Sequence, residues 1–319
     1  MNLKLSAAGF AFQSVKGTPA TEPKWYHPVE GGKLVEFPID QKTDDMTAAT
    51  LTAQSGEYRE SVAAAGGWST RAYAASIVAY AYAVLGAIAT TGSTTKTHTV
   101  TPAGSLPWAT LFGKKDTDYK KAGDAKCDEL TVEWDGNGRL KVTPVWAACT
   151  PLYDEDGFTP VLDETTAAKF AGLGLTAVVD INGSSYDGGG KVLGGKVTIK
   201  RNLESDIVSG SITPDQINEG DFEVEFELKY RVPDLKIIRM MVTGTDSGTT
   251  ASATVLEGDC SLAFASGSTS VTIAGDRIAW QTDEPDADPK GGPGELTLKG
   301  RCYGNFSIVG VNTVASYTS

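Results

Sequence analysis

Residues 221–232, DFEVEFELKYRV, alternate apolar and polar side chains more regularly than any other part of this 319-residue chain. Successive side chains of a β-strand point to opposite faces of a sheet, so the pattern predicts a strand with one buried face. The apolar face would hold Phe222, Val224, Phe226, Leu228 and Tyr230, and the polar face Glu223, Glu225, Glu227, Lys229 and Arg231. Such a strand needs neighbours and a covered core, which restricts the chain to a β-rich fold.

A hairpin is predicted near the middle of the chain. In DELTVEW (128–134), Leu130, Val132 and Trp134 share one face, and the turn DGNG leads into RLKVTPVWAAC. Asp-Gly and Asn-Gly supply the positive φ angles that tight hairpins need. Pro144 in the second arm indicates an edge strand or a bulge. Alternation predicts further strands at residues 34–40, 196–202, 270–275 and 294–311.

One helix is expected at about 70–88. Residues 72–89, AYAASIVAYAYAVLGAIA, carry no charge over a length that could nearly cross a bilayer. Most of the apolar residues are alanine and no basic cluster flanks them, so we interpret the segment as a buried helix rather than a membrane span. Ser69 or Thr70 would cap its start and Gly86 would end it.

The chain shows no composition shift and no obvious internal repeat, which indicates a single domain over residues 1–319. We expect two packed antiparallel sheets, a β-sandwich or half-barrel, with the helix against them. Three irregular segments are expected: an N-terminal arm at 1–30, a polar, Thr-rich loop at 41–57, and an acidic loop rich in Pro and Gly at 281–293.

The composition excludes some classes of function. With 28 Lys and Arg against 40 Asp and Glu, the formal net charge is −12, which does not favour adhesion to nucleic acid. The four cysteines, Cys127, Cys149, Cys260 and Cys302, form no CxxC motif. Because no secretory signal is visible at the N-terminus, we expect them to be free thiols in a reducing compartment.

No catalytic, metal or cofactor site is predicted, so we expect a protein that is not an enzyme. Residues 190–196 fit GxxxxGK, but Val197 stands where a phosphate-binding loop needs Ser or Thr, and a strand follows instead of a helix. The two histidines, His27 and His98, are too few for an imidazole metal site. The acidic clusters at 154–156 and 283–288 lack the twelve-residue calcium-loop pattern.

Several segments, taken in order, resemble the major tail tube proteins of long-tailed bacteriophages of the siphophage type. These are VKGTPATEPKWYHPVE, the helix that ends in VLG, THTVTPAGSLPWATL, AKCDELTVEWDGNGRLKVTPVW, KVTIKRNLES and ITPDQINEGDFEVEFEL. The motifs are weak one by one, and their succession over most of the chain carries the resemblance.

The resemblance implies a structural virion protein that assembles in the host cytoplasm. Homo-hexameric rings would stack into the tail tube, in contact with the tape-measure protein and other tail proteins and without membrane insertion. Subunit sheets would join edge to edge around a lumen through which viral DNA passes without specific binding. The loop at 41–57 would order on stacking against the next ring.

Two acidic sets are candidates for the lumen lining: Glu223, Glu225 and Glu227 on one strand, and Glu129, Glu133 and Asp135 on the hairpin. His98, within the alternating THTVT, is expected to be a structural hydrogen-bonding residue near a subunit edge. The alternative function is a surface or secreted β-sandwich that binds carbohydrate through aromatic residues near turns: Trp25, Tyr26, Trp108 and Trp280.

Overall fold

The computed structural model describes residues 6–44, 56–153, 157–159, 168–185, 191–232, 236–245, 247–253, 255–282 and 294–318. They form a large antiparallel sheet with two helices, which confirms the predicted mainly β fold. The second helix is unexpected. It is the short segment KIIRMMVT, whose Ile237, Ile238 and Met240 are buried.

The elements follow one another along two halves of the chain. The first half contains β1 (Ala7–Phe12), β2 (Trp25–Pro28), β3 (Gly31–Glu36), β4 (Ile39–Asp44), β5 (Gly56–Val62), β6 (Ala64–Arg71), α1 (Ser76–Leu85), β7 (Gly86–Thr91), β8 (Lys96–Pro102), β9 (Ala109–Lys115), β10 (Asp118–Asp135) and β11 (Lys141–Tyr153). The second half contains η2 (Gly172–Gly174), β12 (Leu175–Ile181), β13 (Ser184–Ser185), β14 (Lys191–Lys200), β15 (Glu204–Asp206), β16 (Gln216–Asn218), β17 (Glu223–Val232), α2 (Lys236–Thr243), β18 (Glu257–Ser266), β19 (Thr269–Thr282), β20 (Gly294–Cys302) and β21 (Phe306–Asn312).

Strand pairing follows the same order in both halves. The first half pairs as β2–β1–β9–β10–β11–β6–β3, always antiparallel. The second half pairs as β13–β12–β18–β19–β20–β17–β14, also antiparallel. Corresponding strands come in the same order along the chain. The protein therefore carries two units of one topology, unit 1 (β1 to β11) and unit 2 (β12 to β21).

Smaller features also repeat. Each unit inserts a two-stranded hairpin between its third strand and the next strand of the main sheet: β4–β5 in unit 1 and β15–β16 in unit 2. A helix follows that strand in each unit. Strands β3 and β14, each the third strand of its unit along the chain, both shift register by one residue. The shift lies at Leu34 in β3 and at Leu193 in β14. The sequence shows no obvious repeat, so the duplication is visible only in the topology.

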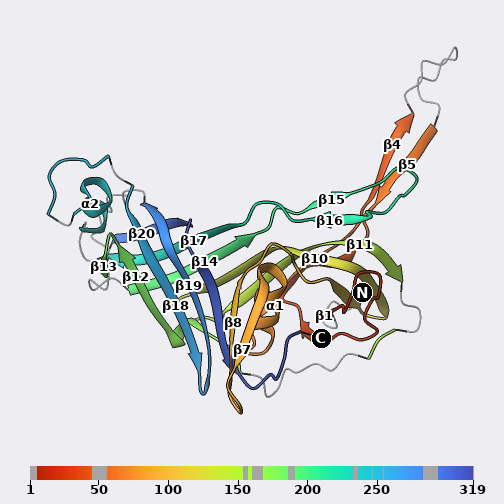
Figure 1. Ribbon diagram of the computed structural model, residues 1–319, viewed down its shortest axis with the longest axis horizontal. Coiled ribbons are helices and arrows are strands. Elements are labelled where there is room, and N and C mark those ends of the chain that lie inside the picture. Colours follow the sequence, from red (N-terminus) through yellow and green to blue (C-terminus); the bar gives the residue numbers. More distant parts are fainter. Residues whose placement is uncertain are drawn as a thin grey trace.

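The two units share one sheet. Strand β10 pairs with β14 across the boundary, and β8 pairs with β21. The hairpin β7–β8 has no counterpart among the described residues of unit 2. Following the pairs from strand to strand never returns to the starting strand, so the described strands form an open, branched sheet rather than a closed barrel. Figure 1 shows β10, β11, β14 and β17 side by side, with α1 against one face of them.

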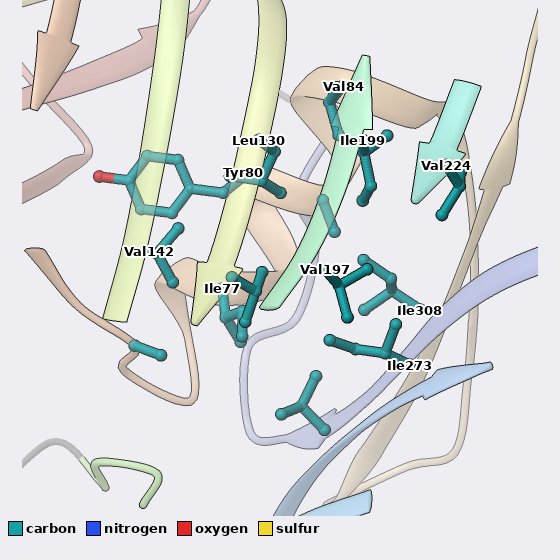
Figure 2. Packing of buried hydrophobic residues seen from close by; sticks show 14 of the residues in the cluster. Ile77, Tyr80, Val84, Leu130, Val142, Val197, Ile199, Val224, Ile273 and Ile308 are labelled. Atoms are coloured by element: carbon teal, nitrogen blue, oxygen red, sulfur yellow. The ribbon is translucent and has the colours of Figure 1, made fainter. Parts of the chain in front are cut away.

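A common core joins the units around α1. Nine of the ten residues of this helix are buried. Figure 2 shows Ile77, Tyr80 and Val84 of α1 among side chains from both units, with Leu130 and Val142 from unit 1 and Val197, Ile199, Ile273 and Ile308 from unit 2. The helix packs so closely that a Cβ on Gly310 would lie 2.2 Å from Val78. At its end, Gly86 adopts the predicted left-handed conformation, with φ of 95°.

The structure corrects several local predictions. Ser69 and Thr70 belong to β6 and do not cap α1, because β3 and β11 pair with this strand on both sides. The supposed N-terminal arm contains β1 and β2, and β1 is almost wholly buried between β2 and β9. Strand β11 is not an edge strand, although β10 shifts register at Asp128, close to Pro144.

Parts of two predicted loops lie outside the described residues. The two ends of the segment predicted as a loop at 41–57 belong to strands β4 and β5, which pair with each other. Residues 45–55 between these strands lie outside the residues that the structure describes. Of the loop at 281–293, the first two residues belong to β19 and the remainder lies outside the description.

Candidate functional site

The two acidic sets predicted from the sequence lie on one face of the sheet. Strand β14 sits between β10 and β17, so that Lys200 is opposite both Glu129 and Glu223, and Lys196 is opposite both Glu133 and Glu227. The apolar residues of these strands point the other way, into the core. We call the outward residues of β10, β11, β14, β17 and β20 the charged face. The predicted sharing of one face by Glu223, Glu225 and Glu227 is confirmed.

Basic residues balance the acids on the charged face. Glu133 pairs with Lys141 at 2.8 Å, Glu225 with Arg301 at 3.3 Å and with Lys200 at 3.7 Å. Glu223 lies 3.7 Å from Arg301, and Glu227 has Lys299 opposite it on β20. Each strand of acids thus has a strand of bases beside it, an arrangement that stabilises neighbouring strands. The two acidic sets that are candidates for the lumen lining are therefore accompanied by bases and do not make this face acidic.

Asp135 lies at the end of the same face. Its register partner is Gly194, which has no side chain to pair with it. Asp135 lines a hollow of about 430 Å³ together with Arg139, Glu133, Lys141, Lys196, Glu227 and Lys229. Acidic and basic side chains therefore both line this hollow.

A second exposed face carries no charge in its central rows. It belongs to the strands β7, β8, β21, β19, β18 and β12. One row across them consists of Ala89, Thr99, Val309, Thr272, Ala263 and Thr176. Away from these rows, three carboxylates on the same strands, Asp180, Asp259 and Asp276, line one shallow hollow.

The hairpins β4–β5 and β15–β16 project from the same end of the sheet, and we call them the hairpin pair (Figure 1). The amide of Val62 donates to the carbonyl of Ile212 at 2.6 Å, which links the two. The base of β15–β16 is anchored by Lys126 of β10. Its ammonium contacts the Glu219 carboxylate at 2.7 Å and the Ile217 carbonyl at 2.8 Å.

In this contact between Lys126 and Glu219, the lysine is the buried partner. Lys126 is 5% exposed and lies 4.2 Å over the ring of Trp108. Burial raises the pKa of Glu219, but hydrogen bonds from Lys126 and from the Leu106 amide outweigh it, so the net pKa lies below the ordinary 4.5. Sequence reasoning missed this pair because the two residues are 93 positions apart.

His98 is a structural residue of the core. Its ring is fully buried, with Nδ1 at 2.9 Å from Thr90 Oγ1 and Nε2 at 3.1 Å from Asn312 Oδ1. Burial lowers its pKa below the ordinary 6.5. The predicted hydrogen-bonding role is confirmed. Its strand β8 lies between β21 and β7, and β7 pairs with no other described strand, so His98 is one strand away from an edge of the sheet.

Features that suggested other functions are accounted for by packing. Trp25, Tyr26 and Trp280 are buried, and Trp108 lies beneath Lys16 and Lys126, so these rings do not form an aromatic platform for a sugar. The strand predicted at 196–202 is confirmed for residues 196–200, but it begins at Lys191, so that most of the GxxxxGK motif belongs to strand β14 itself.

The described residues contain no cluster of three or more His, Cys, Asp or Glu placed to hold a metal ion. The acidic clusters at 154–156 and 283–288 lie outside them. No helix among them has the length and apolar character needed to cross a bilayer, and α1 has ten residues.

Neither a protein-family model nor a curated protein matches this sequence.

Proposed function

We propose that this protein is a subunit of the tail tube of a long-tailed bacteriophage, a structural virion protein with a tail-tube β-sandwich fold and no enzymatic activity. Stacked rings of the chain would form the conduit for DNA, built in the host cytoplasm alongside the tape-measure protein and other tail proteins. The observation that carries the proposal is the continuous sheet β3–β6–β11–β10–β14–β17–β20, which runs through both units and has one face, the charged face, that is bare of other elements among the described residues.

The bare face is the candidate for the lumen wall. The other side of this sheet is covered by α1 and by strands such as β21. When curved sheets join into a ring, the outside of the ring has the larger circumference. The side of the sheet that carries the second layer takes up more space, so we place it on the outside. The bare charged face then lies inside.

The charges of this face suit passage of DNA. Binding to a phosphate backbone requires Lys or Arg that can displace counterions. On the charged face the bases face carboxylates in neighbouring strands, for example Lys141 beside Glu133 and Arg301 beside Glu225. A phosphate would have to compete with these pairs, so DNA would slide past without adhering.

The hairpin pair supports stacking. Both hairpins project from the same end of the sheet, where a second ring would lie above the first (Figure 1). The buried contact of Lys126 with Glu219 holds the base of one hairpin in a defined direction. A projecting hairpin with few contacts to its own subunit is suited to contact another subunit.

Negative-stain microscopy of the purified protein tests the proposal. We expect tubes or stacked rings, with tail-tip initiator added where spontaneous assembly is slow. A monodisperse monomer over a wide concentration range, with no tubes even with initiator, would contradict it. A monomer with affinity for sugars would favour the carbohydrate-binding alternative.

A further inference from the structure

We infer that chains join one another by repeating the junction that joins unit 1 to unit 2, so that each ring contains three chains and not six. This inference rests on the proposed tube function for the existence of a ring. The contact itself follows from the duplicated topology.

The junction inside the chain is the template. The second part of β10 pairs with β14 over seven residues, from Glu129 opposite Lys200 to Asp135 opposite Gly194. The first part of β10 pairs with β9 on the same flank. Counted along the chain without the inserted hairpins, β10 is the sixth sheet strand of unit 1 and β14 is the third sheet strand of unit 2. One unit is thus attached to the next by its sixth strand and the neighbour's third.

The third strand of unit 1 is available for the same contact. Strand β3 pairs with β6 on one flank, and no described strand forms hydrogen-bonded pairs with its other flank, although Val35 packs against Gly113 of β9. Beyond the register shift at Leu34, the Pro38 carbonyl accepts a hydrogen bond from the Ala63 amide at 3.1 Å. Peptide groups alternate in direction along a strand, so those of Phe37 face the open flank.

The sixth strand of unit 2 completes the match. Strand β18 covers one flank of β19 as far as Trp280, whose amide donates to the Leu256 carbonyl at 3.3 Å. Beyond that point, at Gln281 and Thr282, no described strand pairs with this flank, and residues 283–293 lie outside the described part of the chain. In unit 1, β9 pairs with the corresponding flank of β10 only as far as Ala125. From Glu129 onward this flank of β10 pairs with β14.

The open flank of β3 and the end of β19 are therefore different and complementary. Strand β3 resembles β14 and β19 resembles β10, which already pair within the chain. A contact between unlike surfaces generates a ring when the rotation closes. The six-membered ring implied by the family resemblance would then consist of six units from three chains.

Native mass spectrometry of rings released from the tubes counts the chains directly. We expect three chains per ring, with six similar densities around the axis by electron microscopy. Six chains per ring would overturn this inference and leave the tube function intact. Absence of any ring would contradict both.

A pair of variants tests the edge itself. Phe37→Pro removes the amide that faces the open flank, whereas Phe37→Ala removes the ring but keeps the amide. We expect Phe37→Pro to raise the concentration needed for ring formation about tenfold or more relative to Phe37→Ala. Far-UV circular dichroism and melting curves should be alike for both. Equal assembly of two folded variants would exclude β3 as the docking strand.

Discussion

The anchor between Lys126 and Glu219 gives the sharpest test of how the projecting hairpin is held. Changing Glu219→Gln keeps the shape of the side chain and removes its charge. The ammonium of Lys126, 5% exposed, would then retain the Ile217 carbonyl at 2.8 Å and the face of Trp108 but no counter-charge. Removing one partner of a buried pair costs about 3–5 kcal/mol. Because the Glu219 side chain is 18% exposed, we expect the lower end, about 3 kcal/mol.

The pH dependence of this cost has a defined sign. The pKa of Glu219 lies below its ordinary 4.5 in the folded protein, so the carboxylate stabilises the fold above that pH. This contribution is lost as the pH falls through the lowered pKa. Urea unfolding of both proteins should therefore differ most at neutral pH, and the difference should narrow below about pH 4.5.

Glu257→Gln serves as the matched control. It removes the same charge from an exposed pair with Arg277, at 3.1 Å, which solvent screens. We expect no measurable destabilisation. If Glu219→Gln behaves like Glu257→Gln at neutral pH, the anchor does not hold the hairpin and the reasoning fails.

Three further predictions concern the thiols, the hairpins and the charged face. All four cysteines are free thiols in the structure, so a thiol reagent should titrate four groups in the denatured, unreduced protein; two or fewer would contradict this. Backbone amides of β4–β5 should exchange hydrogen fast in the isolated subunit and slowly in the tube, and equal protection would exclude this hairpin from stacking. Replacing Glu223, Glu225 and Glu227 by lysine makes the charged face strongly basic, so tubes should form but DNA ejection should slow; normal ejection would show that this face does not line the lumen.

Local patterns were sufficient for the strands and for the faces they present. Alternation in 221–232 places Phe226 and Leu228 inside and the glutamates outside, as the structure has them. The turn DGNG joins β10 to β11, and Gly136 has the positive φ, 49°, that such a turn needs. These features depend on neighbours in the chain, so the sequence carries them directly.

Contacts between distant segments were not predictable in this way. Ser69 and Thr70 have the residue types of a helix cap, but pairing of β6 with β3 and β11 outweighs that preference. The buried strand β1 has small residues, AAGFAF, whose pattern does not show that two strands flank it. The contact of Lys126 with Glu219 depends on the return of the chain after 93 residues.

The sequence by itself determined a mainly β protein with a buried, alanine-rich helix and two acidic sets that each share one side of a strand. Only the tertiary structure decided that β14 brings the two sets onto one face and neutralises them with Lys196 and Lys200. It also decided that the chain consists of two units of equal topology. The physical reason is that side-chain direction follows from the period of a strand, whereas the order of strands in a sheet depends on pairings between segments far apart in the chain.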